Sequence, residues 1–193
     1  MIRVVLTGTT YSGKTSLLEA LGKEGYHIVP EAETPIVQRL NLMVGQERTQ
    51  QLILGDYSRF KENVGKRQAR LESRIVAADN QIVIQDRCAI DWIAYCKLRK
   101  TEVPPIIQQL ADQYKFQHVL FCEMLSTFDE RREEGRVMTK EEAIRLNELI
   151  EREYIVRGYS PIPVKEIHTG REENIAARVA YIKQILDSSP ASS

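Results

Sequence analysis

The chain alternates short apolar runs with longer stretches in which apolar residues recur every three or four positions. Short apolar runs are typical of buried strands, and a spacing of three or four is typical of helices with one buried face. Strands that alternate with helices predict a parallel sheet with helices on both faces. The five predicted strands are Ile2–Leu6, His27–Val29, Ile82–Ile84, His118–Cys122 and Ile162–Ile167.

Helices are predicted in the first half of the chain by leucine spacing and by helix-end signals. Residues 14–21 carry a stripe of leucines. Thr34 is a suitable N-cap and Pro35 a suitable first-turn residue, so a second helix is predicted to begin there. Its residues expected to be buried are Ile36, Val37 and Leu40.

The segment from Gln46 to Asp79 has no strand signal, and its apolar spacing predicts either two helices or one bent helix. It carries many charged side chains, which we interpret as a solvated face, with the lining of a cleft as the alternative. These charges include Lys61, Lys66, Arg67, Arg70 and Arg74.

In the second half, apolar spacing predicts four helices, near residues 90–98, 104–114, 143–154 and 175–186. The segment Ser126–Val137 lacks this spacing and is predicted to be a mobile charged loop. No internal repeat or linker is found. The sequence therefore predicts one domain over residues 1–187, followed by a polar, disordered tail at 188–193.

A phosphate-binding loop is the strongest functional signal. Residues 8–15 satisfy G-x-x-x-x-G-K-[ST], after an apolar strand and before an apolar-striped helix, as the motif requires. Backbone N–H groups of such a loop surround a β-phosphate. Lys14 is predicted to reach the β/γ oxygens, Thr15 to bind Mg²⁺, and Ser16 to reach the α-phosphate. The predicted nucleotide-binding residues are Gly8, Thr9, Thr10, Tyr11, Ser12, Gly13, Lys14, Thr15 and Ser16.

Composition narrows the choice of partners. The 193 residues are 42% hydrophobic, and 27 basic residues balance 27 acidic ones, so no overall field favours nucleic acid or an anionic membrane. The N-terminal apolar run is too short for a signal sequence or a membrane span, which predicts a cytoplasmic protein. The cysteines and histidines lack metal-binding spacing, so we interpret them as structural.

Two large classes of phosphate-loop proteins are disfavoured. A small GTPase needs D-x-x-G, yet no aspartate here has glycine three residues later. An AAA+ motor or helicase would carry Asp-Glu after an apolar strand, whereas the third strand is followed by Gln85-Asp86-Arg87. The small-molecule kinases remain.

Charged residues after the second and third strands fit that class. Ligands of open α/β sheets bind at the carboxyl ends of strands. Glu31 is a candidate general base for an acceptor hydroxyl, with a helix-start charge as the alternative. Asp86 is a candidate Mg²⁺ ligand and Arg87 a cation for substrate oxygens, with an ordinary ion pair as the alternative.

Kinases bring arginines over the transferred phosphoryl group, because negative charge lies on its equatorial oxygens. Arg131, Arg132 and Arg136 are the candidates for this role. A solvated charge run is the alternative, since acidic residues are interspersed among them.

Several motifs follow one another along nearly the whole chain. They are the phosphate loop, P-E-A at Pro30–Ala32, R-Q-x-x-x-E at Arg67–Glu72, D-R-x-x-x-D at Asp86–Asp91 with Tyr95 beyond it, the arginine-rich segment and Gly158-Tyr159. This succession resembles the P-loop ATPase and kinase family that includes the ribosylnicotinamide kinase domain of the bacterial NAD regulator, an AAA-type ATPase domain. It also resembles thymidylate and deoxynucleoside kinases.

The resemblance implies a three-layer P-loop fold of the nucleoside and nucleotide kinase type, with a five-stranded parallel sheet, ATP or GTP, and Mg²⁺. It implies that Glu31 and Asp86 face the acceptor and the metal, that Arg87 faces the acceptor, and that Gln68 reads its base. The chain departs from the family in the lid, where Asp129-Glu130-Arg131-Arg132 and Glu134-Gly135-Arg136 stand in place of Asp-Gly-x-Arg.

The leading hypothesis is phosphoryl transfer from ATP or GTP to a small hydroxyl-bearing acceptor such as a nucleoside. A nucleotide-gated regulatory NTPase with slow hydrolysis and a protein partner is the alternative, and some relatives act in this way. A polynucleotide 5′-kinase is weakly supported, because the chain is neutral. A homodimer is left open.

Overall fold

One sheet of five parallel strands forms the centre of the computed structural model, which describes residues 1–75, 81–126 and 138–188. The strands lie in the order β2-β3-β1-β4-β5. They are β1 (Ile2–Thr7), β2 (His27–Val29), β3 (Ile82–Asp86), β4 (His118–Cys122) and β5 (Ile162–Val164). The predicted parallel sheet is confirmed. The edge strand β5 is shorter than predicted and ends at Val164; Pro163 within it donates no hydrogen bond to the ladder.

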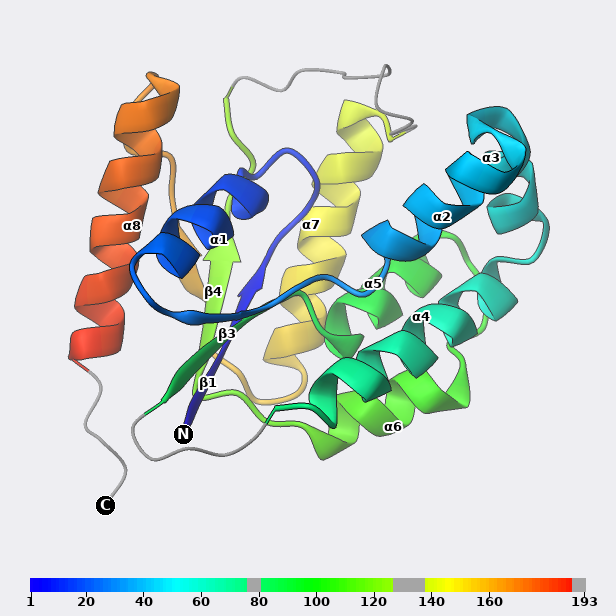
Figure 1. The fold of residues 1–193 in the computed structure, drawn as a ribbon, viewed down its shortest axis with the longest axis horizontal. Helices are drawn as coiled ribbons and strands as arrows, with labels where there is room; N and C mark the ends of the chain where they lie inside the picture. Colours follow the sequence, from blue (N-terminus) through cyan, green and yellow to red (C-terminus); the bar gives the residue numbers. More distant parts are fainter. Residues whose placement is uncertain (76–80, 127–137, 189–193) are drawn as a thin grey trace.

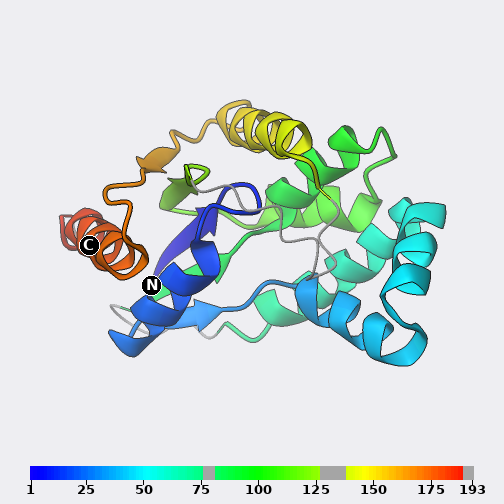
Figure 2. The same ribbon diagram turned by 90° about the horizontal axis from the view of Figure 1, so that it is seen from above.

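Helices cover both faces of the sheet, as predicted, and give three layers (Figures 1 and 2). Helices α1 (Lys14–Lys23) and α8 (Arg171–Asp187) lie on one face. Helices α5 (Ala89–Leu98), α6 (Pro105–Gln113) and α7 (Lys140–Ile155) lie on the other. Alternate residues of β1 point to opposite faces of the sheet and pack into the hydrophobic core on each face. Val4 and Leu6 pack with α1 and α8, whereas Val5 packs with α5 and α7.

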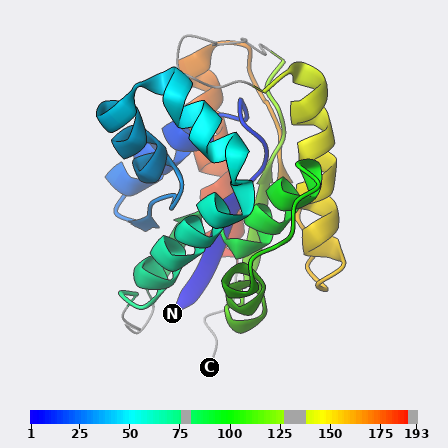
Figure 3. The ribbon, with the colours of Figure 1, turned by 90° about the vertical axis from the view of Figure 1, so that its right-hand side faces the viewer.

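The segment after β2 forms three helices: α2 (Thr34–Val44), α3 (Gln46–Gly55) and α4 (Tyr57–Glu72). The region from Gln46 onward is thus two helices, the first of the two alternatives. Figure 3 shows α2 and α3 as a hairpin beside one end of α4. The predicted N-cap was wrong by one residue, because Glu33 occupies it and Thr34 lies in the first turn. No residue of α2 is fully buried; Ile36 and Val37 are half-buried.

The solvated-face interpretation of the α4 charges is correct for some residues and wrong for one. Lys66 and Arg70 are exposed, and so is Arg74 beyond the helix. Lys61 is fully buried, because α4 packs against the aromatic side of α5 and Lys61 points into this contact. Apolar spacing alone does not detect a charged residue on the buried face of a helix.

Parts of the earlier expectations lie outside the described residues: the charged loop at 127–137 and the tail at 189–193. Among the helices that the structure does describe, none is long and apolar enough to cross a bilayer.

Candidate functional site

The phosphate loop leaves the carboxyl end of β1, passes close to β4 and enters α1. Gly8 has φ 127°, and a Cβ there would lie 2.3 Å from the Cys122 carbonyl oxygen. Gly13 has φ 75° and is the N-cap of α1. Both conformations favour glycine, and the first also leaves no space for a side chain. The two motif glycines are therefore required by the backbone path.

Lys14 is buried and folds back over the loop. Its Nζ donates hydrogen bonds to the Thr9 carbonyl oxygen and to Ser12 Oγ, the second at 2.8 Å. Burial lowers the pKa of Lys14 to about 7, and the positive charge of Arg87 adds to this effect. Asp86 and Glu31 act in the opposite direction. The ammonium is thus held among loop oxygens at a position where all three of these side chains influence its charge.

Two residues that sequence reasoning missed support the loop from other elements. Arg178 on α8 donates from Nη1 to the Ser12 carbonyl oxygen at 2.9 Å and from Nη2 to the Val164 carbonyl oxygen at 3.0 Å. The Thr9 N–H donates to Asn147 Oδ1 on α7 at 3.3 Å. A single sequence offers no signal for either contact, because each residue lies more than 130 positions from its partner in the loop.

The remaining loop residues keep their predicted roles as predictions, and the structure gives their positions. Thr15 is exposed and Ser16 half-buried in the first turn of α1. Tyr11 has a left-handed backbone with φ 66°, and its carbonyl accepts from the Leu125 N–H at 3.2 Å. The Thr10 hydroxyl lies 3.6 Å from Met138 Sδ. Thr15 is therefore accessible to solvent at the N-terminus of α1, where anions are favoured.

Glu31 and Arg87 form an ion pair between the ends of β2 and β3. Arg87 Nε lies 3.0 Å from Glu31 Oε1, and the Thr34 hydroxyl donates to Glu31 Oε2 at 2.5 Å. Burial alone would raise the pKa of Glu31, but Arg87 and the Thr34 hydrogen bond outweigh it and lower that pKa. Glu31 is thus ionised at neutral pH and fixed in orientation.

The backbone of Arg87 explains this orientation. Its φ is 59°, in the left-handed region, which costs roughly 1 kcal/mol for a non-glycine residue. The Arg87 N–H donates to the Leu6 carbonyl oxygen of β1 at 3.1 Å. The chain therefore turns sharply where β3 ends, and this turn aims the buried guanidinium at Glu31 rather than along the sheet.

Asp86 ends β3 opposite Leu6 of β1. Its Oδ1 atom is buried without a hydrogen-bond partner among the described residues. Burial raises the pKa of Asp86 to about 6, and the neighbouring charge of Glu31 adds to the shift. A buried carboxylate oxygen without a partner is an expected feature of a ligand-binding or metal-binding position.

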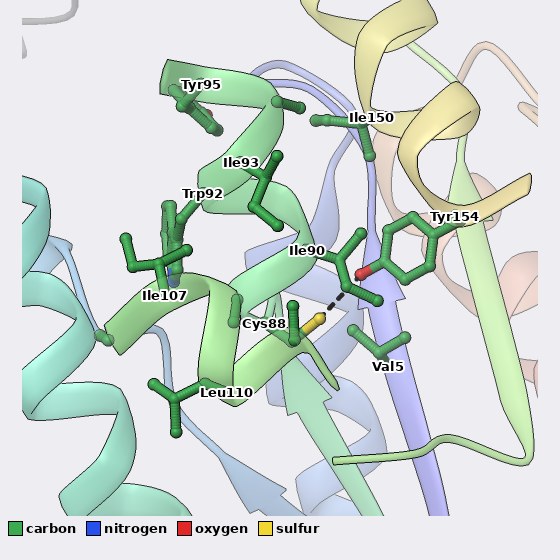
Figure 4. Packing of buried hydrophobic residues seen from close by; sticks show 14 of the residues in the cluster. Val5, Cys88, Ile90, Trp92, Ile93, Tyr95, Ile107, Leu110, Ile150 and Tyr154 are labelled. Carbon is green, nitrogen blue, oxygen red and sulfur yellow. Dashed lines mark hydrogen bonds between the residues drawn. The ribbon is translucent and has the colours of Figure 1, made fainter. Parts of the chain in front are cut away.

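Asp91, on α5, is a buried carboxylate that contacts the same site through Arg87. It accepts hydrogen bonds from the Thr7 hydroxyl, the Cys88 N–H and, at 2.7 Å, the Tyr154 hydroxyl. Its Oδ1 lies 3.8 Å from Arg87 Nη1. Asp91 is the last residue of the D-R-x-x-x-D motif and had no predicted role. In the structure its hydrogen bonds connect β1, α5 and α7. Figure 4 shows the Tyr154 hydroxyl near Cys88.

The structure brings together Lys14, Glu31, Asp86 and Arg87, but places Gln68 in a different network. Gln68 Nε2 donates to Glu72 Oε1 at 3.1 Å, and Glu72 pairs with Arg3 near the start of β1. The base-reading role of Gln68 stays a prediction. Arg131, Arg132 and Arg136 lie outside the described residues.

The oxygen donors of this site suit a Mg²⁺ ion that is also bound by the phosphates of a nucleotide. Within residues 1–75, 81–126 and 138–188, no cluster of three or more acidic, histidine or cysteine side chains could hold a metal alone. Asp86 Oδ1, which has no partner among the described residues, and the hydroxyl of the exposed residue Thr15 are oxygen donors, which Mg²⁺ prefers. Mg²⁺ commonly takes only one or two protein ligands beside phosphate and water.

Comparison with solved structures identifies the fold. A NadR protein in complex with NR aligns at TM-score 0.63 and 18% identity, covering 97% of this chain and 50% of that one. Thymidylate kinase from Ehrlichia chaffeensis aligns at TM-score 0.64 and 14% identity, covering 96% and 98%. Deoxyadenosine kinase from M. mycoides with bound dATP aligns at TM-score 0.63 and 16% identity, covering 97% and 100%.

The chain thus spans about half the length of the NadR protein and nearly all of the two kinases. No curated protein matches by sequence. A family model described as an AAA domain matches residues 3–173. The chain therefore belongs to the AAA domain family, with the fold of the P-loop nucleoside and nucleotide kinases.

Proposed function

We propose that this protein transfers the γ-phosphoryl group of Mg²⁺-ATP or Mg²⁺-GTP to a hydroxyl of a small acceptor such as a nucleoside. The main support is the meeting of the loop lysine with two carboxylates and an arginine at one edge of the sheet. A phosphate loop by itself accounts for nucleotide binding. The charged groups opposite it add what an acceptor needs: a proton acceptor and a fixed cation.

On the donor side, the backbone N–H groups of residues 8–15 bind the phosphates, and Lys14 neutralises the β/γ oxygens. Thr15 and Asp86 would hold Mg²⁺, directly or through water. When bound, Mg²⁺ supplies positive charge that stabilises the transition state. Arg178 and Asn147 keep the loop in shape from two different elements.

On the acceptor side, Glu31 accepts the proton of the attacking hydroxyl. Arg87 and Thr34 orient its carboxylate while leaving part of it exposed, at 21%. The lowered pKa makes Glu31 a weak base. This suits phosphoryl transfer, whose loose transition state depends more on positioning than on basicity. Arg131, Arg132 and Arg136 keep their predicted role as closing arginines.

Acceptor-dependent release of ADP or GDP from a panel of nucleosides and nucleotides tests the proposal. Turnover that requires both an acceptor and Mg²⁺, and that is lost in Lys14→Ala, is the expected result. Tight nucleotide binding with hydrolysis that ignores every acceptor would contradict it.

That contrary outcome would favour the second candidate, a nucleotide-gated regulatory protein. The observation behind this alternative is the α2–α3 hairpin, where large apolar side chains face solvent. Leu42 is 90% exposed, Met43 68% and Leu54 61%. Exposed apolar side chains that gather on one hairpin are typical of protein-binding surfaces.

A further inference from the structure

Lys61 on α4 is a buried cation that the proposed mechanism does not use. Its side chain is 0% exposed, and its Nζ pairs with Glu33 Oε2. Four aromatic rings, which we call the aromatic box, surround the ammonium. The distances from Nζ to the ring centroids are 4.5 Å for Trp92 and Tyr95, 5.3 Å for Tyr57 and 5.4 Å for Phe60.

These contacts explain how a lysine can be buried here. An ammonium loses strong hydration on burial, which is costly unless a carboxylate and other favourable partners replace water. Glu33 supplies the opposite charge, and the ring faces supply cation–π attraction. The box is therefore an environment selective for positive charge, and the chain fills it with its own side chain.

The aromatic box borders the acceptor side of the site. The centroid of the Tyr95 ring lies 4.5 Å from Lys61 Nζ and 5.3 Å from the guanidinium carbon of Arg87. Glu33, the partner of Lys61, lies two residues after Glu31, the partner of Arg87. Figure 4 shows Trp92 and Tyr95 projecting from the same side of α5. Two ion pairs therefore hold the segment after β2, and the cations of both pairs lie close to the ring of Tyr95.

We infer that Lys61 determines acceptor specificity: by filling the aromatic box, it excludes an acceptor whose ring carries a positive charge. Four ring faces beside a carboxylate would otherwise bind a pyridinium or a quaternary ammonium. With Lys61 in place, such a ring meets a like charge, and Glu33 is already neutralised. The acceptor is therefore a hydroxyl-bearing molecule with an uncharged ring. This inference rests on the proposed function, which places an acceptor beside Arg87.

A pair of ribosides that differ only in ring charge tests the wild-type protein. Nicotinamide riboside has a pyridinium ring, and its 1,4-dihydro form is neutral. Titration calorimetry without a phosphoryl donor should give an affinity for the neutral form at least about tenfold higher. Equal affinities, or tighter binding of the cation, would overturn the inference.

A substitution tests the box itself. Trp92 is the only tryptophan, so its fluorescence reports on the box. In Lys61→Ala, tetramethylammonium should change this fluorescence and bind about tenfold or more tightly than in the wild type. Lys66→Ala, an exposed change on the same helix, should behave as the wild type. A folded Lys61→Ala protein, verified by circular dichroism, that shows no gain would overturn the inference.

The two experiments separate the two proposals. If neither riboside binds while Lys61→Ala gains tetramethylammonium binding, the role of Lys61 in the box stands and the proposed acceptor class fails. If Lys61→Ala does not fold, titration of the wild type decides the matter. Tetramethylammonium binding at the Trp92 site in the presence of Lys61 would then overturn the inference.

Discussion

Asp86 and Glu31 are two carboxylates at the same edge of the sheet whose surroundings move their pKa values in opposite directions. Burial and the charge of Glu31 raise the pKa of Asp86 to about 6. Burial opposes ionisation of Glu31 as well, but Arg87 outweighs it and lowers that pKa. Both groups are ionised at neutral pH, but the net effect of the surroundings disfavours the charged form of Asp86 and favours that of Glu31. Such opposed shifts are typical of functional sites.

The first prediction concerns the free energy of unfolding of the ligand-free protein. The folded pKa of Asp86 lies above its ordinary value of 3.8, so stability falls as pH rises between these values, and the loss is complete above about pH 6. Asp86→Asn should therefore stabilise the protein by about 1–3 kcal/mol at pH 8 and have little effect at pH 4.

Chemical denaturation at the two pH values, without Mg²⁺ or nucleotide, measures this difference. Asp112→Asn, at an exposed position, is the matched control and should change stability little at either pH. Equal stability of Asp86→Asn and wild type at pH 8 would mean that the folded protein bears no cost for this charge.

The second prediction concerns Glu31→Gln, which keeps the side-chain shape and removes the charge. General-base contributions are typically ~10²–10⁴ in rate, so kcat on a genuine acceptor should fall by about a hundredfold or more. The affinity for Mg²⁺-ATP should stay within about threefold, because the proposal assigns its binding to residues 8–15. Steady-state kinetics and a nucleotide titration measure both. An unchanged kcat would transfer the base role to Asp86.

At the scale of elements, α8 has a function that its apolar pattern does not reveal. The helix covers the core with Val179, Ile182 and Leu186, as predicted. One residue before Val179 it also buries Arg178, whose guanidinium joins the phosphate loop to β5. Helix packing and loop geometry are therefore coupled through one side chain.

The third prediction follows from this coupling. Arg178→Met leaves two buried carbonyl groups without their donor, which costs about 1–3 kcal/mol for each group left unsatisfied. The loop should become less ordered, so the affinity for Mg²⁺-ATP should fall by about tenfold or more, whereas the KM for the acceptor should change little. Lys183→Ala on the same helix, at an exposed position, is the control. Equal losses for nucleotide and acceptor would indicate general unfolding.

At the scale of the molecule, strand order explains why the site forms. β1 lies at the centre of the sheet, between β3 and β4. The phosphate loop after β1 is therefore adjacent to Asp86 and Arg87 at the end of β3, and β2 beyond β3 brings Glu31 to the same edge. Open α/β sheets bind ligands at this edge.

The fourth prediction is a metal-dependent stabilisation. Mg²⁺-ATP at about 100 times its Kd should raise the free energy of unfolding by ~2.7 kcal/mol, which corresponds to roughly 5–11 °C in Tm for a chain of this size. Removal of Mg²⁺ with EDTA at the same ATP concentration should reduce the shift. Lys14→Ala should lose more of the ATP shift than of the ADP shift. An ATP shift unaffected by EDTA would argue against a metal at Thr15 and Asp86.

Local patterns of residues were enough to predict the strands, most of the helix positions and the phosphate loop. Apolar runs located all five strands, helical spacing located the helices, and the glycines and lysine of residues 8–15 identified the loop. Glu31, Asp86 and Arg87 could be proposed because each follows a strand end, and parallel strands bring such ends to one edge. These inferences need only neighbours in sequence and one rule about sheets.

Contacts between residues far apart in sequence could be found only from the folded structure. Arg178 reaches Ser12 across 166 positions, and Tyr154 reaches Asp91 across 63. Lys61, interpreted as a solvated charge, is buried because two helices present aromatic rings and a loop presents Glu33 at one point in space. Burial and pKa depend on everything packed around a group, and packing partners are chosen by the fold rather than by local sequence.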